Sequence, residues 1–443
     1  MIRRHALQQL EDWKRQVEHK PIVLRGARQV GKTTLVNLFA ESFDNYLYLN
    51  LDRARDCQLF EEDDTATLIN KIHIHCKKRK SDGDTLLFID EVQNSPKAVK
   101  MLRYLREEAP QMYVIAAGSL LESLIDSHIS FPVGRVEYMA LRPCSFCEFL
   151  DGIGEDYDAE MVRELKGDAI HDRLIGHFLN YVLVGGMPEA IMKYAERRDI
   201  LAVNSIYSTF LNAYSDDVQK YARNNTMAAV IRHVLREGWS YAAEPISFNN
   251  FAGSSYRSRE MSEALRTIER ALLLELAYPV TSEQIPLLPN SRRKPKLLWL
   301  DTGLVNYYAG VREEIFSVDD IMSAWKGRVA EHVVAQELIA ENTEFGVRRF
   351  FWMRDKVDAT AEVDFVYQYH NMVIPIEVKS GTNSKLRSLH QFLEAAPHDI
   401  AVRVWTGKYS IDDVRTPSGK SFRLVNIPFY YVGQLNRILA KLC

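Results

Sequence analysis

Short apolar runs alternate with stretches of helical periodicity through the first 150 residues. Runs of strand type occupy residues 21–25, 45–52, 85–89 and 112–119, and helical patterns separate them. Strands that alternate with helices are typical of a mostly parallel sheet, whose ligands lie at the carboxyl ends of the strands. The pattern therefore predicts an α/β domain over residues 1–150.

Helical periodicity dominates residues 151–225. Gly185 and Pro188 interrupt it, so one helix is expected to end and another to begin between them. Asp216 and Asp217 form a paired acid in this region. Such a pair at a helix start balances the helix dipole more often than it takes part in catalysis. The segment is predicted to be a small, all-helical unit.

Residues 226–305 give helical patterns, then a strand-like end with a basic turn, which is the order of a winged helix-turn-helix. Residues 221–300 carry 11 Lys and Arg against 7 Asp and Glu, a net charge of +4, whereas the whole chain has −3. The basic side chains are Arg257, Arg259 and Arg266 on or beside the expected recognition helix, and Arg292, Arg293 and Lys294 in the turn. They predict contact with DNA phosphates and bases, although such modules also bind proteins.

Length and composition exclude several classes of protein. At 443 residues the chain exceeds one hydrophobic core, so two to four domains of about 100 to 200 residues are expected. Its 47% hydrophobic and 26% charged residues are those of an ordinary globular protein. Neither a signal peptide nor an apolar run of about 18 residues is present, so a cytoplasmic protein without a membrane partner is expected. Five scattered cysteines, including the Cys144 and Cys147 pair, do not complete a zinc site.

A phosphate-binding motif directly follows the first strand-like run. The segment "GARQVGKTT" supplies Gly26, Ala27, Arg28, Gln29, Val30, Gly31, Lys32, Thr33 and Thr34. Two glycines let the backbone N–H groups wrap an anion, and the helix that begins near Lys32 points its positive end at the phosphates. Lys32 is expected to reach the β- and γ-phosphates of ATP, and the Thr33 hydroxyl to bind Mg²⁺.

A second element supplies acids at a strand end. In "TLLFIDE" a buried-type strand ends in Asp90 and Glu91. Asp90 is expected to hold Mg²⁺ through water, and Glu91 to orient the attacking water, which makes this a hydrolysis site. Ser119 follows another strand and either senses the γ-phosphate or caps the next helix; the sequence leaves both roles open.

Several motifs together resemble one family. "LRGARQVGKTT", "LLFIDEVQ", "IAAGS", "VGRVEYMALRPCSFCEFL" and "GGMPEA" look like the AAA-family ATPases of bacteria and archaea that carry a C-terminal domain resembling PD-(D/E)XK nucleases. The resemblance spans nearly the whole chain and implies an AAA+ P-loop ATPase core at 1–150, a helical lid at 151–225, a winged helix-turn-helix at 226–305 and a PD-(D/E)XK nuclease-like domain at 306–443. It also implies a homo-oligomer, possibly a hexameric ring, in which Arg135 reaches the γ-phosphate of a neighbouring subunit; the alternative for Arg135 is a surface charge.

The C-terminal region contains an acid–lysine pattern on two strand-like runs. Because strand side chains alternate between faces, Glu377 and Lys379 of "IEVK" lie on one face, and Asp364 comes alongside if the two runs pair. Asp364 and Glu377 are expected to bind Mg²⁺, while Lys379 positions or deprotonates water for phosphodiester hydrolysis. A solvated network of cross-strand charges is the alternative. Glu331, on the preceding helix, matches a further metal acid of many PD-(D/E)XK nucleases, and a solvated helix glutamate is its alternative. Pro375 removes a ladder donor and is tolerable at a strand start or an edge.

These patterns predict a Mg²⁺-dependent ATPase that binds or remodels DNA, duplex or branched (such as Holliday junctions), with cleavage left open. The alternative is an ATP-dependent switch in defence or stress signalling that binds a protein partner and has no nuclease activity. A protein-remodelling motor ranks third, because the chain has one phosphate loop and no evident substrate-recruiting domain.

Overall fold

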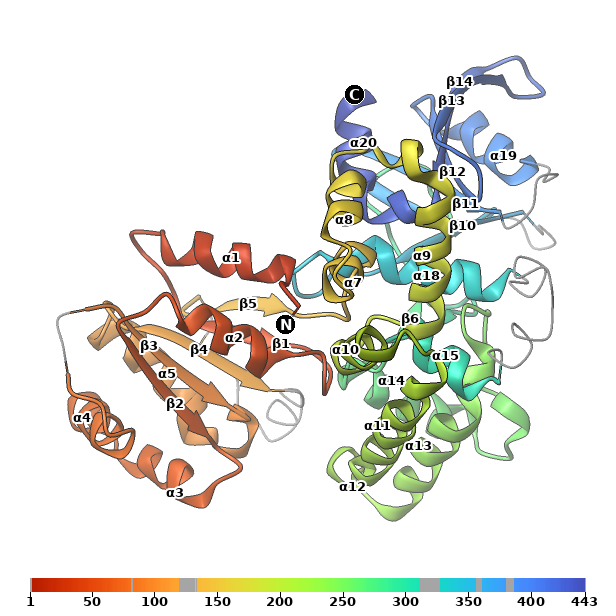
Figure 1. Cartoon of the computed structure of the whole chain (residues 1–443). Helices are drawn as coiled ribbons and strands as arrows, with labels where there is room; N and C mark the ends of the chain where they lie inside the picture. The colour runs from red at the N-terminus through yellow and green to blue at the C-terminus, as the bar shows by residue number, and fades with distance from the viewer. Residues whose placement is uncertain are drawn as a thin grey trace.

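A computed structural model describes residues 2–80, 83–118, 132, 134–310, 327–355, 361–379 and 386–442. The N-terminal sheet and its helices form one body, and the rest of the chain forms a larger body beside it (Figure 1). Ser119 lies outside the described residues, so its two expected roles stay untested. Among the described residues, no helix combines the length and the apolar character needed to cross a membrane.

The N-terminal body is a parallel five-stranded sheet with the order β2-β3-β4-β1-β5. The strands are β1 (Ile22–Arg25), β2 (Asn45–Asn50), β3 (Thr85–Asp90), β4 (Tyr113–Gly118) and β5 (Glu137–Ala140). Helices α1 (His5–Lys14) and α2 (Lys32–Ala40) share one buried cluster with the sheet, and α4 (Thr65–His75) and α5 (Pro96–Glu108) share another; the short α3 (Ala54–Cys57) follows β2. Apolar layers on both faces explain why β1 and β3 are buried throughout. The predicted parallel sheet is confirmed.

The next segment is helical, as predicted. It consists of α7 (Phe146–Gly152), α8 (Asp156–Arg163), α9 (His171–Val184), α10 (Pro188–Arg197), α11 (Asn204–Asp216) and α12 (Val218–Tyr221). The expected break falls at Gly185, which ends α9 with φ 77°. A Cβ there would also lie 2.4 Å from Asp301 Oδ1, so both the backbone and the packing require glycine.

Residues 225–308 form two main helices and a two-stranded antiparallel sheet. The elements are α13 (Asn225–Glu237), α14 (Ser258–Arg270), β6 (Leu274–Ala277), β8 (Lys296–Trp299) and α15 (Thr302–Tyr308). Trp299 stacks on Trp239 with 3.9 Å between ring centres, which anchors the sheet to the helices. Between β6 and β8, the short β7 (Pro279–Val280) leaves this unit and pairs with a strand of the C-terminal sheet. The C-terminal sheet therefore extends across the boundary expected at residue 305.

The C-terminal part is a mixed seven-stranded sheet with the order β13-β14-β12-β11-β10-β9-β7. After helix α18 (Arg328–Ala340) come β9 (Phe350–Met353), β10 (Glu362–Tyr369), β11 (Met372–Val378), α19 (Arg387–Ala395), β12 (Ile400–Trp405), β13 (Ser410–Arg415), β14 (Ser421–Pro428) and α20 (Leu435–Leu442). Strands β10 and β11 pair antiparallel, which is the predicted hairpin.

Pro375 occupies a position that the sequence did not anticipate. It lies inside β11, opposite Val366, and β11 has a neighbour on both sides, so the residue is at neither a strand start nor an edge. Strand β12 pairs only with Ile376–Val378. Pro375 therefore lies just before the stretch in which β12 bonds to β11, where a missing N–H does least harm.

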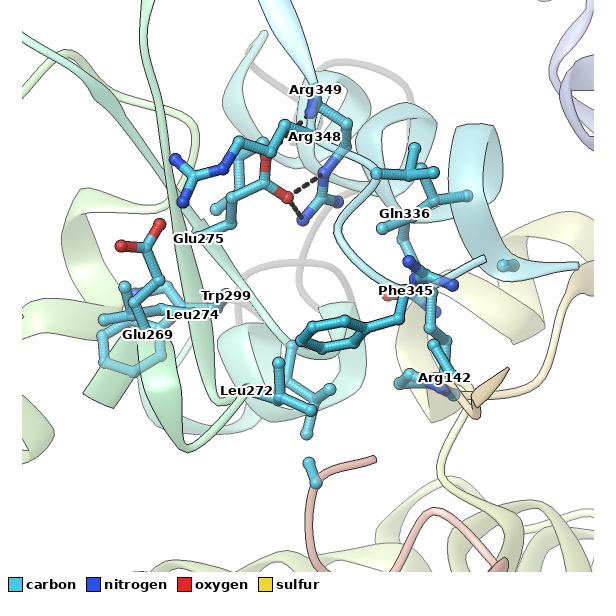
Figure 2. A pocket seen from close by; sticks show the side chains of 18 of the residues that line it. Arg142, Glu269, Leu272, Leu274, Glu275, Trp299, Gln336, Phe345, Arg348 and Arg349 are labelled. Carbon is cyan, nitrogen blue, oxygen red and sulfur yellow. Dashed lines mark hydrogen bonds and ion pairs between the residues drawn. The ribbon is translucent and has the colours of Figure 1, made fainter. Parts of the chain in front are cut away.

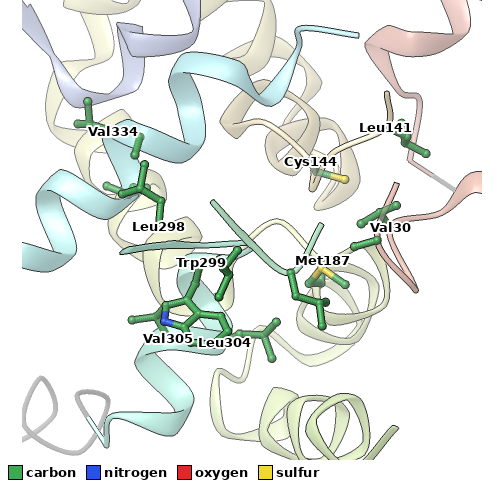
Figure 3. Close-up of a cluster of buried hydrophobic side chains, with 14 of the residues drawn as sticks. Val30, Leu141, Cys144, Met187, Leu298, Trp299, Leu304, Val305 and Val334 are labelled. Atoms are coloured by element: carbon green, nitrogen blue, oxygen red, sulfur yellow. The ribbon is translucent and has the colours of Figure 1, made fainter. Parts of the chain in front are cut away.

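One continuous hydrophobic cluster joins the parts of the molecule. It includes Leu24 of β1, Trp299 of β8 and Ile376 of β11. Figure 3 shows its centre, where Val30 and Leu141 belong to the same cluster as Met187 and Leu298. Because protein interiors are close-packed, a shift in one part is transmitted to the others.

Candidate functional site

The phosphate loop (residues 26–34) connects β1 to α2 at the carboxyl edge of the N-terminal sheet. Gly31 has φ 95° and Gln29 has φ 67°, so the loop curls through left-handed conformations. A Cβ on Gly26 would lie 2.5 Å from the carbonyl oxygen of Leu141, just beyond β5. Gly26 is thus required by the backbone that crosses beside it, and Gly31 by its own dihedral angle.

Lys32 lies buried inside the curl of the loop. Its Nζ donates hydrogen bonds to the carbonyl oxygens of Gly26 and Ala27, each at 2.9 Å. Burial lowers the pKa of Lys32 to about 8, against the opposing influence of Glu91 and Asp90. A phosphate beside this ammonium would favour its charged form, so the residue is suited to bind an anion.

The hydroxyl and the carboxylate expected to bind Mg²⁺ meet at the loop. Thr33 Oγ1 donates a hydrogen bond of 2.8 Å to Oδ2 of Asp90, which is 5% exposed at the end of β3. The next residue, Glu91, has φ 54° and accepts a hydrogen bond from the Gln93 amide. The left-handed backbone and the amide together fix the position of the Glu91 carboxylate.

A cavity of about 840 Å³, the nucleotide cavity, opens over the loop. It is lined by Arg28, Gln29 and Gly31 to Thr34 of the loop, by Asp90 and Glu91, and by Pro188, Glu189 and Met192 of α10, with Ile2 and Arg4 from the N-terminus. Its volume lies within the range of about 300–1,000 Å³ that small-molecule sites occupy. Helix α10 thus faces the phosphate loop across this space.

Two contacts around the loop were not foreseen from the sequence. Arg4 is buried and donates to Glu148 Oε2 at 2.9 Å and to the carbonyl of Val30 at 2.9 Å. It thus connects the phosphate loop to Glu148 of α7. Arg28 of the loop pairs with Asp217 at the end of α11. Asp217 was interpreted as a dipole-compensating acid; its ion pair instead connects the helical segment to the loop. A charged run at an N-terminus gives no signal that one arginine is buried.

Arg135 lies near the amino end of β5, at the edge of the N-terminal sheet opposite the one that carries the phosphate loop. It precedes β5, whose Glu137 is level with Ile22 at the start of β1, and it pairs with Glu107 of α5. Its side chain is 42% exposed. From this position it cannot reach the phosphates bound by its own chain, so any action on nucleotide must occur across an interface between subunits.

The acids of the C-terminal region surround two lysines. Lys379 Nζ lies 2.5 Å from Glu377 Oε1, and the Val378 N–H donates to Asp364 Oδ2 at 2.7 Å. On the other side, Nζ of the buried Lys296 lies 3.1 Å from Glu331 and 2.6 Å from Glu362. Lys296 is 35 residues from Glu331 along the chain, so the sequence shows it only as part of a basic segment.

Burial and mutual repulsion raise the pKa of three of these acids, Glu331, Asp364 and Glu377. Burial, then Asp364, raises the pKa of Glu331 and of Glu377 to about 7, and burial raises that of Asp364. Glu377 is 5% exposed, and its Oε2 has no hydrogen-bond partner among the described residues. A buried carboxylate oxygen without a partner is costly unless a cation or proton binds it.

The ligand atoms of Glu331, Asp364 and Glu377 do not all lie within 4.8 Å of one another. Within the described part of the chain, the one set of three His, Cys, Asp or Glu residues with ligand atoms inside 4.8 Å of one another is Glu155, Asp158 and His177. That set is already compensated, because Arg198 pairs with Glu155 and Arg173 with Asp158. Two guanidinium groups supply the positive charge that a metal ion would bring.

Three family models match successive parts of the chain. The model of the AAA domain matches residues 18–150, a domain of unknown function (DUF8612) matches 175–315, and another (DUF4143) matches 326–430. Together with the phosphate loop, Asp90 and Glu91, the first match identifies an ATPase domain of the AAA type that binds nucleotide. The protein is therefore an ATP hydrolase.

Similar proteins add no further assignment. Uncharacterized proteins Mb2031c of Mycobacterium bovis and Rv2008c of Mycobacterium tuberculosis are each 25% identical over 396 residues, covering 86% of this chain and 75% of their own. The Walker-type ATPase PABY2304 of Pyrococcus abyssi has a TM-score of 0.39 at 12% identity, covering 68% of this chain and 94% of its own. The RuvB Holliday junction branch migration motor of Thermotoga maritima has a TM-score of 0.28 at 15% identity, covering 62% and 90%. These scores are too low to transfer a property to this chain.

Proposed function

We propose that this AAA-type ATPase acts on DNA as a homo-oligomer, and that its C-terminal domain is a nuclease-like domain that binds Mg²⁺. The ATPase and DNA-directed activities belong to separate residues. The proposal therefore divides into a hydrolysis step, a DNA surface and a metal site, each with its own support.

The hydrolysis step follows from the side chains around the nucleotide cavity. Lys32 and the loop N–H groups would bind the β- and γ-phosphates of ATP, and Glu91 would accept a proton from the attacking water. Thr33 and Asp90, already 2.8 Å apart, would hold Mg²⁺, which neutralises charge on the phosphates when bound. Pro188 and Met192 of α10 would cover the nucleotide and limit its contact with bulk water.

The proposed DNA surface lies on α14 and on the segment before β8. Arg257, Arg259 and Arg266 are exposed, and Arg259 and Arg266 are seven residues apart and so share a face of the helix. Arg292 and Lys294 are exposed in the segment before β8. Such side chains suit a helix in a groove with flanking phosphate contacts, as in a winged helix.

The observation that carries the C-terminal proposal is the imbalance of charge around Glu377. Four carboxyl groups (Glu331, Glu362, Asp364 and Glu377) share two ammonium groups (Lys296 and Lys379). When all are ionised the group has a deficit of two positive charges, and Glu377 Oε2 has no hydrogen-bond partner among the described residues. A Mg²⁺ ion bound by Asp364, Glu377 and Glu331 fits both facts, because Mg²⁺ prefers carboxylate oxygens.

Such an ion would polarise a phosphodiester, while Lys379 would hold the attacking water beside Glu377. The test uses the full chain with ATP and Mg²⁺, and with no DNA, single strands, duplex or four-way junctions. ATP turnover and DNA cleavage are followed in the same samples. We expect one DNA form to accelerate turnover and the Asp364→Asn variant to lose Mg²⁺-dependent cleavage; Asp413→Asn, exposed on the edge strand β13, is the control.

The DNA surface is tested separately with Arg259→Ala and Arg266→Ala. Each should weaken DNA binding at low salt and reduce the salt dependence of binding by about one ion. Arg415→Ala, an exposed arginine of β13, should leave binding unchanged. Equal affinity in all three variants would remove α14 from the DNA surface.

The second candidate is a nucleotide switch that binds a protein partner and cuts nothing. It is favoured by one observation: the acids near Glu377 are already paired with Lys296 and Lys379, and no three of them have ligand atoms that all lie within 4.8 Å of one another, as those of the Glu155 set do. Under this alternative no DNA form changes ATP turnover and none is cut. The same experiment therefore separates the two candidates.

A further inference from the structure

A second cavity, the junction cavity, lies beside the phosphate loop where three parts of the chain meet (Figure 2). Its volume is about 250 Å³. One wall comes from α14, β6 and β8, and the other from α18 and the segment after it, with Arg142 on the side of Phe345 (Figure 2). Ala27 of the phosphate loop lines it, but no residue lines both this cavity and the nucleotide cavity.

The walls of the junction cavity are largely apolar and aromatic. Leu272, Leu274 and Trp299 line one side, and the Phe345 ring lies across the space from them (Figure 2). A cavity of about 150 Å³ holds benzene, so a volume of about 250 Å³ suits a two-ring aromatic body. Such walls favour a flat ring through burial of apolar area and ring–ring contact.

The charged groups of the lining leave an excess of positive charge. Glu275 is fully engaged, because Arg349 contacts it with Nε at 2.9 Å, NH2 at 2.8 Å and its backbone N–H at 2.7 Å. Burial raises the pKa of Glu269, whose carboxyl accepts the Leu276 N–H at 3.0 Å. Both acids are therefore already engaged by groups of the protein.

Arg142 is a cation that forms no direct ion pair among the described residues. It donates to the carbonyl oxygens of Asn342 and Glu344. Burial and the neighbouring Arg349 lower the pKa of Arg142 to about 10, against the weaker opposing influence of Glu275 and Glu344. Arg348, exposed at the opposite rim, adds a second positive charge. A guanidinium held only by carbonyl dipoles in a partly dry site attracts an anion.

From these contacts we infer that the junction cavity binds a small aromatic carboxylate, with the ring between Phe345 and Leu272 and the carboxylate on Arg142. The ligand would touch the phosphate loop at Ala27 while leaving the nucleotide cavity open. This site is independent of whether the C-terminal domain cuts DNA, because it shares no residue with the acids around Glu377.

The first test compares two probes on the wild-type full chain by titration calorimetry. The probe is 2-naphthoate, and its neutral counterpart of the same shape is 2-naphthamide. We expect naphthoate to bind at least about tenfold more tightly, the range that a charge-assisted hydrogen bond provides. Absence of naphthoate binding, or equal binding of the two probes, overturns the inference without any variant being made.

Variants then locate the binding. Arg142→Met keeps an unbranched apolar stem but removes the guanidinium, and it should weaken naphthoate about tenfold without affecting naphthamide. Ala340→Phe places a ring in the cavity from α18 and should abolish binding of both. Arg415→Ala, an exposed arginine of β13 outside the cavity, is the matched control and should bind as the wild type does. Undiminished naphthoate binding to a folded Ala340→Phe protein would place the probe elsewhere and overturn the inference.

Discussion

The guanidinium of Arg25 lies 4.0 Å from the centre of the Phe345 ring. Arg25 is the last residue of β1, immediately before the phosphate loop, and Phe345 belongs to the segment that follows α18. Beside this pair, the Ala140 N–H donates to the carbonyl of Thr343 at 2.7 Å, which extends β5 toward the same segment. The C-terminal part of the chain is thus fastened to the ATPase sheet directly beside its nucleotide-binding loop.

Phe345→Ala should loosen this attachment. The change removes a cation–π contact, of about 0.5–2 kcal/mol, together with part of the apolar wall of the junction cavity. We expect a lower unfolding temperature and faster amide exchange in residues 341–346. Phe345→Leu keeps apolar bulk but has no ring, so its unfolding temperature and exchange rate should lie between those of the wild type and of Phe345→Ala. Unchanged exchange in both variants would mean that other contacts hold the segment.

Lys32→Ala should abolish ATP turnover. The ammonium is the buried cation of the phosphate loop, and loss of one preorganised charge or donor at a reacting group costs about 100-fold or more. Turnover is measured with the far-ultraviolet circular dichroism spectrum as the control for folding. A folded variant with normal turnover would contradict the assignment of the nucleotide site.

Glu91→Gln should separate hydrolysis from binding. The amide keeps the size of the side chain but cannot accept the proton of water, so turnover is expected to fall by about 100-fold or more. Affinity for a fluorescent ATP analogue should change little. Glu91 lines the cavity beside Asp90, but the expected metal ligand is Asp90 and not Glu91. Parallel losses of turnover and affinity would instead indicate that Glu91 holds the metal or the fold of the loop.

Arg135→Ala tests whether subunits complete one another's sites. Arg135 lies at the edge of the sheet opposite the phosphate loop. The variant should therefore lose turnover because its arginine is missing from the nucleotide site of a neighbouring subunit, and not from its own. Mixing it with the Lys32→Ala protein should restore part of the activity, since each supplies what the other lacks. Arg103→Ala is the matched control, because Arg103 pairs with the same Glu107 from within α5. If mixing restores nothing while oligomers form, Arg135 is a surface charge.

The stability of the protein should depend on pH through Glu337. Burial raises the pKa of this α18 carboxyl from 4.5 to about 8, although the Tyr181 hydroxyl donates to it at 2.7 Å and the Phe146 N–H at 3.0 Å. The folded protein keeps the proton while the unfolded chain releases it above pH 4.5, so this group destabilises the fold as the pH rises from about 4.5 to about 8. The slope is about 1.4 kcal/mol per pH unit.

Glu337→Gln isolates this contribution from those of other buried acids. The neutral amide retains the acceptor for Tyr181 and Phe146 and has no proton to lose. Unfolding temperature should therefore fall less between pH 5 and pH 8 in the variant than in the wild type. Identical pH profiles would show that Glu337 is ionised in the folded protein.

The local features of the sequence predicted much of the architecture. The β1 to α2 junction follows from "PIVLRGARQVGKTT", since an apolar run, glycines and a helical pattern each act over a few residues. The same holds for the break at Gly185 and the β10–β11 hairpin. For Pro375 the sequence predicted a strand start or an edge, which was wrong. The pairing of β12 with only part of β11 tolerates the proline, and this register cannot be read from the sequence of either strand.

Tertiary structure alone decided which distant charges meet. Asp217 contacts Arg28 across 189 positions of sequence, and Lys296 contacts Glu331 and Glu362 from a segment that composition describes only as basic. Spacing along the chain determines neighbours within a helix or a hairpin, so the sequence by itself determined the strands, the phosphate loop and the acid–lysine hairpin. Ion pairs and cavities between elements depend on how those elements pack in three dimensions, and that packing placed Arg4 under the loop, Phe345 on Arg25 and Arg142 beside an apolar cavity.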